Sequence, residues 1–286
     1  DYQTLRADNP RLVYCSVTGF GQTGPYRDMV GHDVNYLALG GVLGNIGTGP
    51  EELPAIPGTQ IADVAAGGMN AAIGILLALL ARERSGEGEY IDVSMTDGIV
   101  AMNGYAATFL WMLGESLQPG RSMLTGRYPW YRVYRCADGR DLSIGAVERR
   151  FWERLCEHFG VPEWAPLQHL DEKAPEMHAS FEARFAEKSR DAWFEELRSL
   201  DVCVAPVLDP REAFASEQVK ARDLVVEVEK RGRRQKLLGV AIKLSETPGS
   251  IESPPPEFGE HTDQVLSSLG YDAEAIARLR QSGDVS

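Results

Sequence analysis

Hydrophobic and polar positions along the first 120 residues predict strands and helices in alternation. The mostly apolar run 12–17 is typical of a strand buried in a parallel sheet. A long apolar segment predicts a helix that starts near Asp63 and stops at Ser85-Gly86, where a basic turn precedes a glycine. Residues 90–95 alternate as a second strand, and residues 98–113 are again helical. This alternation predicts the α/β class.

The pattern changes after residue 120. Residues 131–136 and 141–145 flank an Asp-Gly turn, which predicts a hairpin. The remaining elements expected from the pattern are helices at 151–159 and about 176–200, a strand at 204–208, a strand from Leu237, and a last helix after three prolines at 254–256. The first strand candidate is of a type that normally has neighbours on both sides, so we expect a missing portion upstream.

Charge and cysteine usage narrow the possible functions. The 286 residues carry a formal net charge of −13, which argues against a nucleic-acid partner. The four cysteines lie far apart without a C-x-x-C pair, so we expect a reduced, cytoplasmic setting.

The apolar run 65–81 is just short of a membrane span, holds Asn70, and is bounded by charged residues. We interpret it as a core helix and expect no membrane partner.

Three polar residues at loops or helix starts are candidates for chemistry. His32 lies between two glycine-rich loops and suits proton transfer near neutral pH, although a turn or capping role is the commoner one. Asp63 begins a long apolar helix, where a cap is an equally good interpretation. Glu148 stands at a strand–helix junction and could simply be a helix-start acid or a partner of Arg149 and Arg150.

Together these three residues form a possible acid–base set, which by itself does not name a reaction. A metal site of one histidine and two carboxylates is conceivable, but no helical i, i+4 ligand spacing supports it, so we expect no metal. The other histidines have no matching acidic spacing, and we interpret them as surface or structural residues.

Stretches of the chain resemble the family III CoA-transferases, in order and over nearly the whole length. They are 9–26 with its Gly19–Pro25 loop, the helix end 82–88, and residues 92–95, 201–207 and 259–262. The resemblance implies an α/β fold with an incomplete Rossmann-like large domain, a smaller α+β domain, and an interlocked homodimer. The large domain would cover 1–120 without its N-terminal portion, the small domain 121–225, and a C-terminal return to the large domain 226–286.

Within the family, the segment 31–36, Asp63 and the segment 145–148 look like the α-methylacyl-CoA racemases. The resemblance implies that His32 and Asp63 are the catalytic pair and that Glu148 supports His32. It also implies contact with the acyl-CoA substrate at Gly31, Asp33, Val34, Asn35 and Tyr36. One departure is that racemases usually carry Gly-Asp-Phe-Gly-Gly-Gly around the aspartate, whereas this chain has Ala62-Asp63-Val64-Ala65-Ala66-Gly67-Gly68.

The expected reaction is a 1,1-proton transfer at the α-carbon of a 2-methylacyl-CoA through an enolate. His32 would serve one face and Asp63 the other, with the backbone N–H of Asp33 as a donor to the oxyanion. Coenzyme A would enter as part of the substrate, without a further cofactor. Two alternatives stay open: a CoA-transferase that moves CoA between carboxylic acids through an aspartyl intermediate at Asp63, and a truncated, non-catalytic family member.

Overall fold

The structure is a computed structural model that describes residues 1–230 and 232–285. The chain forms two compact units, Asp1–Val207 and Leu208–Ser286. The first unit holds two separate clusters of buried side chains, one between residues 36 and 99 and one between residues 128 and 202. The domain boundaries near 120 and 225 stay a prediction.

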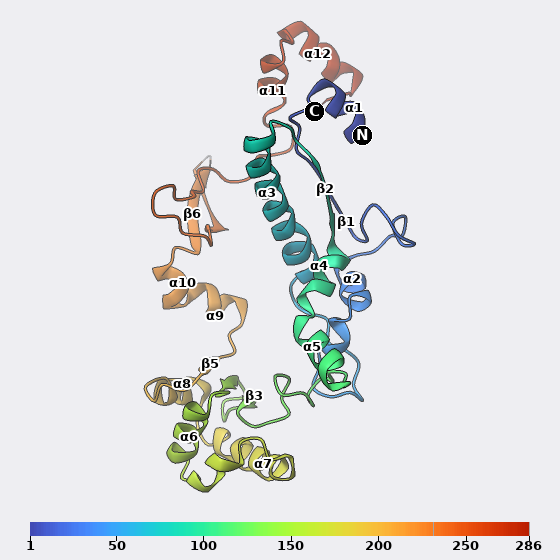
Figure 1. Ribbon diagram of the computed structural model, residues 1–286. Coiled ribbons are helices and arrows are strands. Elements are labelled where there is room, and N and C mark those ends of the chain that lie inside the picture. The colour runs from blue at the N-terminus through green and yellow to red at the C-terminus, as the bar shows by residue number, and fades with distance from the viewer. Residues whose placement is uncertain (231, 286) are drawn as a thin grey trace. The chain divides into compact units, whose positions relative to one another are not determined.

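The first cluster lies beside a parallel pair of strands, β1 (Tyr14–Thr18) and β2 (Tyr90–Ser94), in which Tyr14 pairs with Tyr90. Both strands were predicted to within two residues, and the predicted α/β class is confirmed. The helix α3 (Asn70–Ser85) runs along the strand pair (Figure 1). It ends at Gly86, which adopts the left-handed conformation at φ 76°, as the basic turn and glycine predicted.

Further helical elements surround this strand pair. They are α1 (Tyr2–Asp8), α2 (Asp33–Leu39), the short 3-10 helix η1 (Leu43–Asn45), the π-helical segment η2 (Ala62–Met69), α4 (Met95–Met102) and α5 (Gly104–Leu113). The single helix expected over 98–113 is therefore two helices. They are divided at Asn103, whose side-chain amide donates to the carbonyl of Gly40 at 2.6 Å.

The long apolar helix is largely exposed within this chain. The segment Ala62–Ser85 comprises 24 residues and is, by length and composition, able to cross a membrane, a test that core helices of soluble proteins also pass. The α3 side chains more than half exposed include those of Ile73, Leu76, Leu77 and Leu80. The interpretation as a core helix is therefore wrong within the first unit, because the described residues of that unit leave this face exposed.

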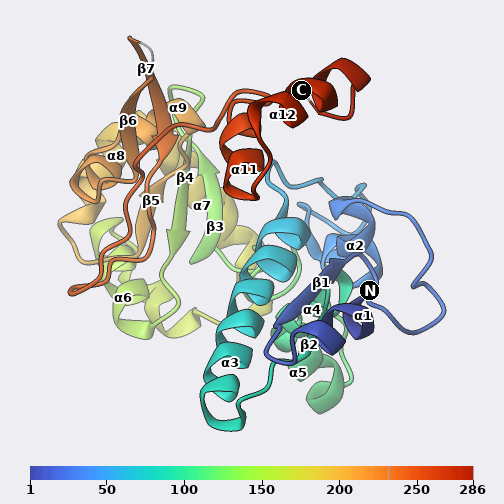
Figure 2. The same cartoon turned by 90° about the horizontal axis from the view of Figure 1, so that it is seen from above.

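The second part of the first unit is built on an antiparallel sheet (Figure 2). Its strands are β3 (Tyr131–Arg135), β4 (Asp141–Gly145) and β5 (Val204–Pro206), in the order β3-β4-β5. The predicted hairpin is confirmed. The helical elements here are α6 (Arg149–His158), η3 (Pro162–Leu167), η4 (Asp171–Lys173), α7 (Ala174–Phe185) and α8 (Arg190–Arg198). Large aromatic side chains fill the core, with Tyr134 stacked on Phe185 at 4.5 Å between ring centroids.

The second unit contains a hairpin and two pairs of short helices. Its elements are α9 (Pro210–Ala215), α10 (Glu217–Ala221), β6 (Val225–Lys230), β7 (Arg233–Leu238), α11 (Thr262–Ser268) and α12 (Ala273–Ser282). The strand expected from Leu237 is wrong, because β7 ends at Leu238. Five of the six residues of β7 are exposed, and its first four are charged or polar. The sequence of β7 therefore lacks the apolar alternation by which a strand is recognised.

Candidate active site

The start of α2 carries His32 and Asp33. His32 occupies the N-cap position in an extended conformation, with φ −132° and ψ 175°, and is exposed. Its backbone N–H donates to Oδ1 of Asn35 at 3.0 Å, which fixes the turn that leads into the helix. His32 therefore occupies the helix-capping position that the sequence offered as one interpretation. Because it is exposed, it is also accessible to a substrate.

The carboxylate of Asp33 joins two helix starts. Its Oδ1 accepts from the backbone N–H of Ala62 at 2.6 Å and from that of Asp63 at 3.1 Å. First-turn N–H groups lack acceptors within their own helix, so a side chain from elsewhere stabilises them. This contact holds Asp63 close to the start of α2, and therefore close to His32.

Asp63 is not the cap that its position in the sequence allowed. The N-cap of η2 is Ile61, and Asp63 lies inside the first turn, where Asp33 takes the capping role. Within the part of the chain that the structure describes, the Asp63 carboxylate makes no hydrogen bond or ion pair, and the residue is exposed. The carboxylate is therefore available for chemistry. π-Helical segments such as η2 are frequent at functional sites.

Tyr36, one turn into α2, is electrostatically coupled to this carboxylate. Its side chain is buried, and its hydroxyl donates to the carbonyl oxygen of Gly31 at 2.5 Å. Burial raises the pKa of the Tyr36 hydroxyl, and the negative charge of Asp63 raises it further. A Cβ at Gly19 would lie 2.4 Å from the Tyr36 ring, so the glycine-rich loop allows the ring this close approach.

The other residues expected at the substrate take structural places around α2. Asn35 holds the His32 N–H, and Val34 is half-buried in the first turn. The backbone N–H of Asp33 lies in that same turn and makes no hydrogen bond within residues 1–230 and 232–285. It remains available as the expected oxyanion donor. Contact of these residues with a substrate stays a prediction.

Glu148 lies in the other part of the first unit. It is the exposed N-cap residue of α6, with φ −70° and ψ 138°. Arg149 pairs with Glu153 at 2.7 Å rather than with Glu148. Burial raises the pKa of the Cys203 thiol, and the negative charge of Glu148 raises it further. No hydrogen bond between described residues joins Glu148 to His32, and their convergence stays a prediction.

A cavity of about 540 Å³ lies next to the Glu148 segment. Its lining includes Gly47 and Thr48, the loop 124–126, and residues of β3 and β4 as far as Gly145. Gly145 is three residues before Glu148 in the sequence. Leu124, Ile144 and Val133 make part of its wall apolar.

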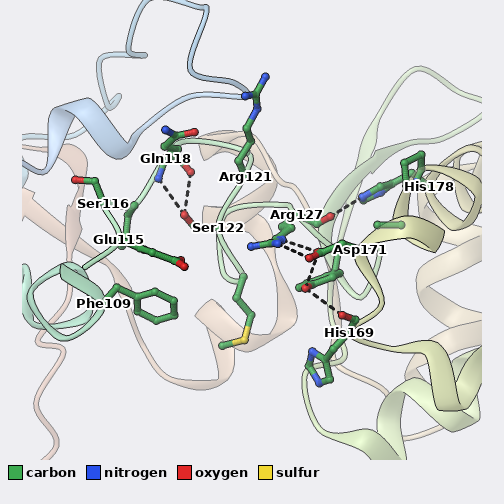
Figure 3. Close-up of a pocket in the computed structure, with 16 residues that line it drawn as sticks. Phe109, Glu115, Ser116, Gln118, Arg121, Ser122, Arg127, His169, Asp171 and His178 are labelled. Atoms are coloured by element: carbon green, nitrogen blue, oxygen red, sulfur yellow. Dashed lines mark hydrogen bonds and ion pairs between the residues drawn. The ribbon is translucent and has the colours of Figure 1, made fainter. Parts of the chain in front are cut away.

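A second cavity, of about 860 Å³, was not expected from the sequence (Figure 3). Arg127 and Asp171 lie at its edge, with Nε to Oδ1 at 2.8 Å and Nη2 to Oδ2 at 2.5 Å. The Arg127 guanidinium lowers the pKa of the Asp171 carboxyl, which also accepts from the Tyr128 hydroxyl at 2.9 Å. The Glu115 side chain points into the cavity from the opposite side (Figure 3). No local pattern joins residues 44 positions apart, and this explains why the cavity was missed.

The fold and this arrangement define an α/β protein with an imidazole and a free carboxylate at adjacent helix starts. CoA-transferase family III matches residues 1–262, and the chain belongs to that family. The family resemblance expected from the sequence is thereby confirmed.

Similar proteins include enzymes of two reaction types. The human alpha-methylacyl-CoA racemase is 35% identical over 282 residues, which cover 97% of this chain and 72% of that protein. The succinyl-CoA–L-malate CoA-transferase beta subunit of Chloroflexus aurantiacus is 33% identical over 293 residues, or 98% of this chain and 71% of that protein. The crystal structure of a CAIB/BAIF family protein from Brucella suis covers 94% of this chain and 71% of its own, with a TM-score of 0.77 and 27% identity. The expected fold is thus confirmed.

Proposed function

We propose that this protein racemises a 2-methylacyl-CoA by 1,1-proton transfer at the α-carbon. The observation that carries the proposal is the double hydrogen bond of Asp33, which keeps His32 and Asp63 at neighbouring helix starts. A reaction that removes a proton from one face and returns it to the other needs two such groups. The human and mouse racemases, at 35% and 38% identity, support this choice of substrate class.

The reaction begins with loss of the α-proton to His32 for one enantiomer. Negative charge then develops on the thioester oxygen, and the Asp33 N–H donates to it from the first turn of α2. Asp63, in its protonated form, delivers a proton to the opposite face, and the two residues exchange roles for the other enantiomer. Each positioned acid or base contributes about 10²–10⁴ in rate, and an oxyanion donor about 10²–10³.

We further propose that Glu148 orients the His32 ring in an assembled homodimer. His32 and Glu148 are both exposed in the single chain, so His32 of one subunit and Glu148 of the other can come into contact in a dimer. The exposed apolar face of α3 supports assembly, because contiguous apolar surface of this kind typically marks an interface. In this arrangement the 540 Å³ cavity would take the apolar part of the acyl group.

The test is α-proton exchange in D₂O, followed by mass spectrometry of separate R and S forms of a 2-methylacyl-CoA. We expect the unaltered protein to incorporate deuterium into both enantiomers and to interconvert them. Asp28→Asn is the matched control for Asp63→Asn, because Asp28 is exposed and, among the described residues, pairs with its neighbour Arg27 alone. If the unaltered protein binds the thioester without any incorporation of deuterium, the racemase proposal is wrong.

A second candidate function is CoA transfer between carboxylic acids, with Asp63 as the nucleophile. Its support is the unpartnered Asp63 carboxylate together with the 33% identity to a CoA-transferase subunit. This candidate predicts that hydroxylamine traps an activated Asp63 during turnover and that His32→Ala keeps transferase activity. Absence of a trapped product, combined with loss of activity in His32→Ala, would exclude it.

A further inference from the structure

The second unit contains a cavity of its own, of about 750 Å³, between the short helices and the hairpin. The helices α9 and α10 supply one part of its lining, and the strands β6 and β7 supply most of the rest. Its lining residues are Arg211, Phe214, Ala215, Lys220, Val225, Lys236, Leu237 and Leu238. All of them belong to the unit Leu208–Ser286.

The charged residues that line this cavity are all cationic. Arg211, Lys220 and Lys236 are cationic, and no lining residue is acidic, although the whole chain has a net charge of −13. The side chains of Arg211 and Lys220 make no hydrogen bond or ion pair within the described ranges, and Lys236 approaches Glu227 only to 3.9 Å. A concentration of cations, two of them without an ion-pair partner among the described residues, favours an anionic ligand in an acidic protein.

The rest of the lining is apolar and open to solvent. Phe214 on α9 is 51% exposed and Leu238 on β7 is 67% exposed, and Val225 and Leu237 add further apolar lining from the hairpin. An inorganic anion would leave this surface in water, whereas a ligand with an apolar chain would cover it. The site therefore matches a molecule that has an anionic head group and a hydrocarbon chain.

We propose that this cavity binds the free carboxylate of a medium-chain fatty acid. The head group pairs with Arg211, Lys220 and Lys236, and the chain lies against Phe214 and Leu238. All residues of this site come from the second unit, whereas His32 and Asp63 belong to the first, so the proposal does not depend on the reaction proposed for those two residues.

The experiment measures binding of dodecanoate to the full chain by displacement of a dansyl-labelled undecanoate. We expect Lys220→Glu and Lys236→Glu each to weaken binding about 10-fold or more, since each replaces attraction with repulsion at the head group. Lys243→Glu is the matched control: it makes the same change of charge in the same unit at an exposed lysine outside the cavity. It should change the affinity less than 2-fold.

Two further measurements separate head group and chain. Ala215→Trp fills the cavity without a change of charge and should abolish binding, and dodecanol should compete poorly because it lacks the negative charge. The proposal is overturned if Lys243→Glu weakens binding as much as Lys220→Glu, or if Ala215→Trp binds normally. It is also overturned if the protein binds only phosphatidylglycerol vesicles, which would indicate a membrane surface. His32→Ala should bind dodecanoate normally even if it is inactive.

Discussion

Replacing Asp33 by alanine removes the acceptor that two backbone N–H groups of η2 share. The bond from Ala62 is short, at 2.6 Å, and Ala62 is fully buried, so water cannot replace the lost acceptor there. A hydrogen bond to a charged group contributes about 1.5–3 kcal/mol, and a helix cap about 1 kcal/mol. The bond from Asp63 is longer, at 3.1 Å, and exposed, so it adds less. We expect a local loss of about 2 kcal/mol.

Hydrogen–deuterium exchange of peptides covering residues 60–70 measures this loss where it occurs. A change of about 2 kcal/mol corresponds to roughly 30-fold faster exchange of the η2 amides. Asp33→Asn keeps an acceptor oxygen and loses only the charge, so its effect should be smaller, at about 1 kcal/mol or less. Asp28→Ala serves as the control, because the exposed Asp28 carboxylate accepts from Arg27 at 3.1 Å and from no other group in the part of the chain that the structure describes.

The same variant should lower the rate of α-proton exchange, because Asp63 is no longer held beside α2. A displacement of about 1 Å can cost about 10² in rate. Unchanged amide exchange over residues 60–70 in Asp33→Ala would refute the capping role. Faster amide exchange with full catalytic activity would instead show that the Asp33 contact does not organise the site.

Three other perturbations test separate parts of the structure. Gly98→Ala should destabilise the protein by about 1–3 kcal/mol in urea unfolding, because its Cβ would lie 2.6 Å from the Cβ of Ala66. Glu148→Gln should slow proton exchange roughly 10²-fold and shift its pH–rate profile if Glu148 orients His32, whereas a purely structural role would leave the profile unmoved. Burial lowers the pKa of His178 in the folded protein, so the unfolded state takes up a proton first as the pH falls through about 6.5. The free energy of unfolding should therefore decline as the pH falls from 7 to 5. His178→Gln should make that decline smaller when it is measured by urea titrations across this pH range.

Local patterns predicted the strands β1 and β2 and the hairpin of β3 and β4 well, because each depends on neighbouring residues. The Asp-Gly turn alone places β3 against β4, and the glycine after the basic turn ends α3. The role of Asp33 had no such signal, since its acceptor contact spans 29 residues. Exposure of α3 was likewise beyond prediction, because apolar composition does not say which surface covers a helix.

The pairing of His32 and Asp63 is tested most directly by the stereochemistry of deuterium incorporation in single variants. In a two-base reaction, His32→Ala should still exchange the α-proton of the enantiomer that faces Asp63, while it no longer interconverts R and S forms. Asp63→Asn should show the opposite preference. Equal loss of exchange from both enantiomers in both variants, or continued racemisation in either one, would contradict the account.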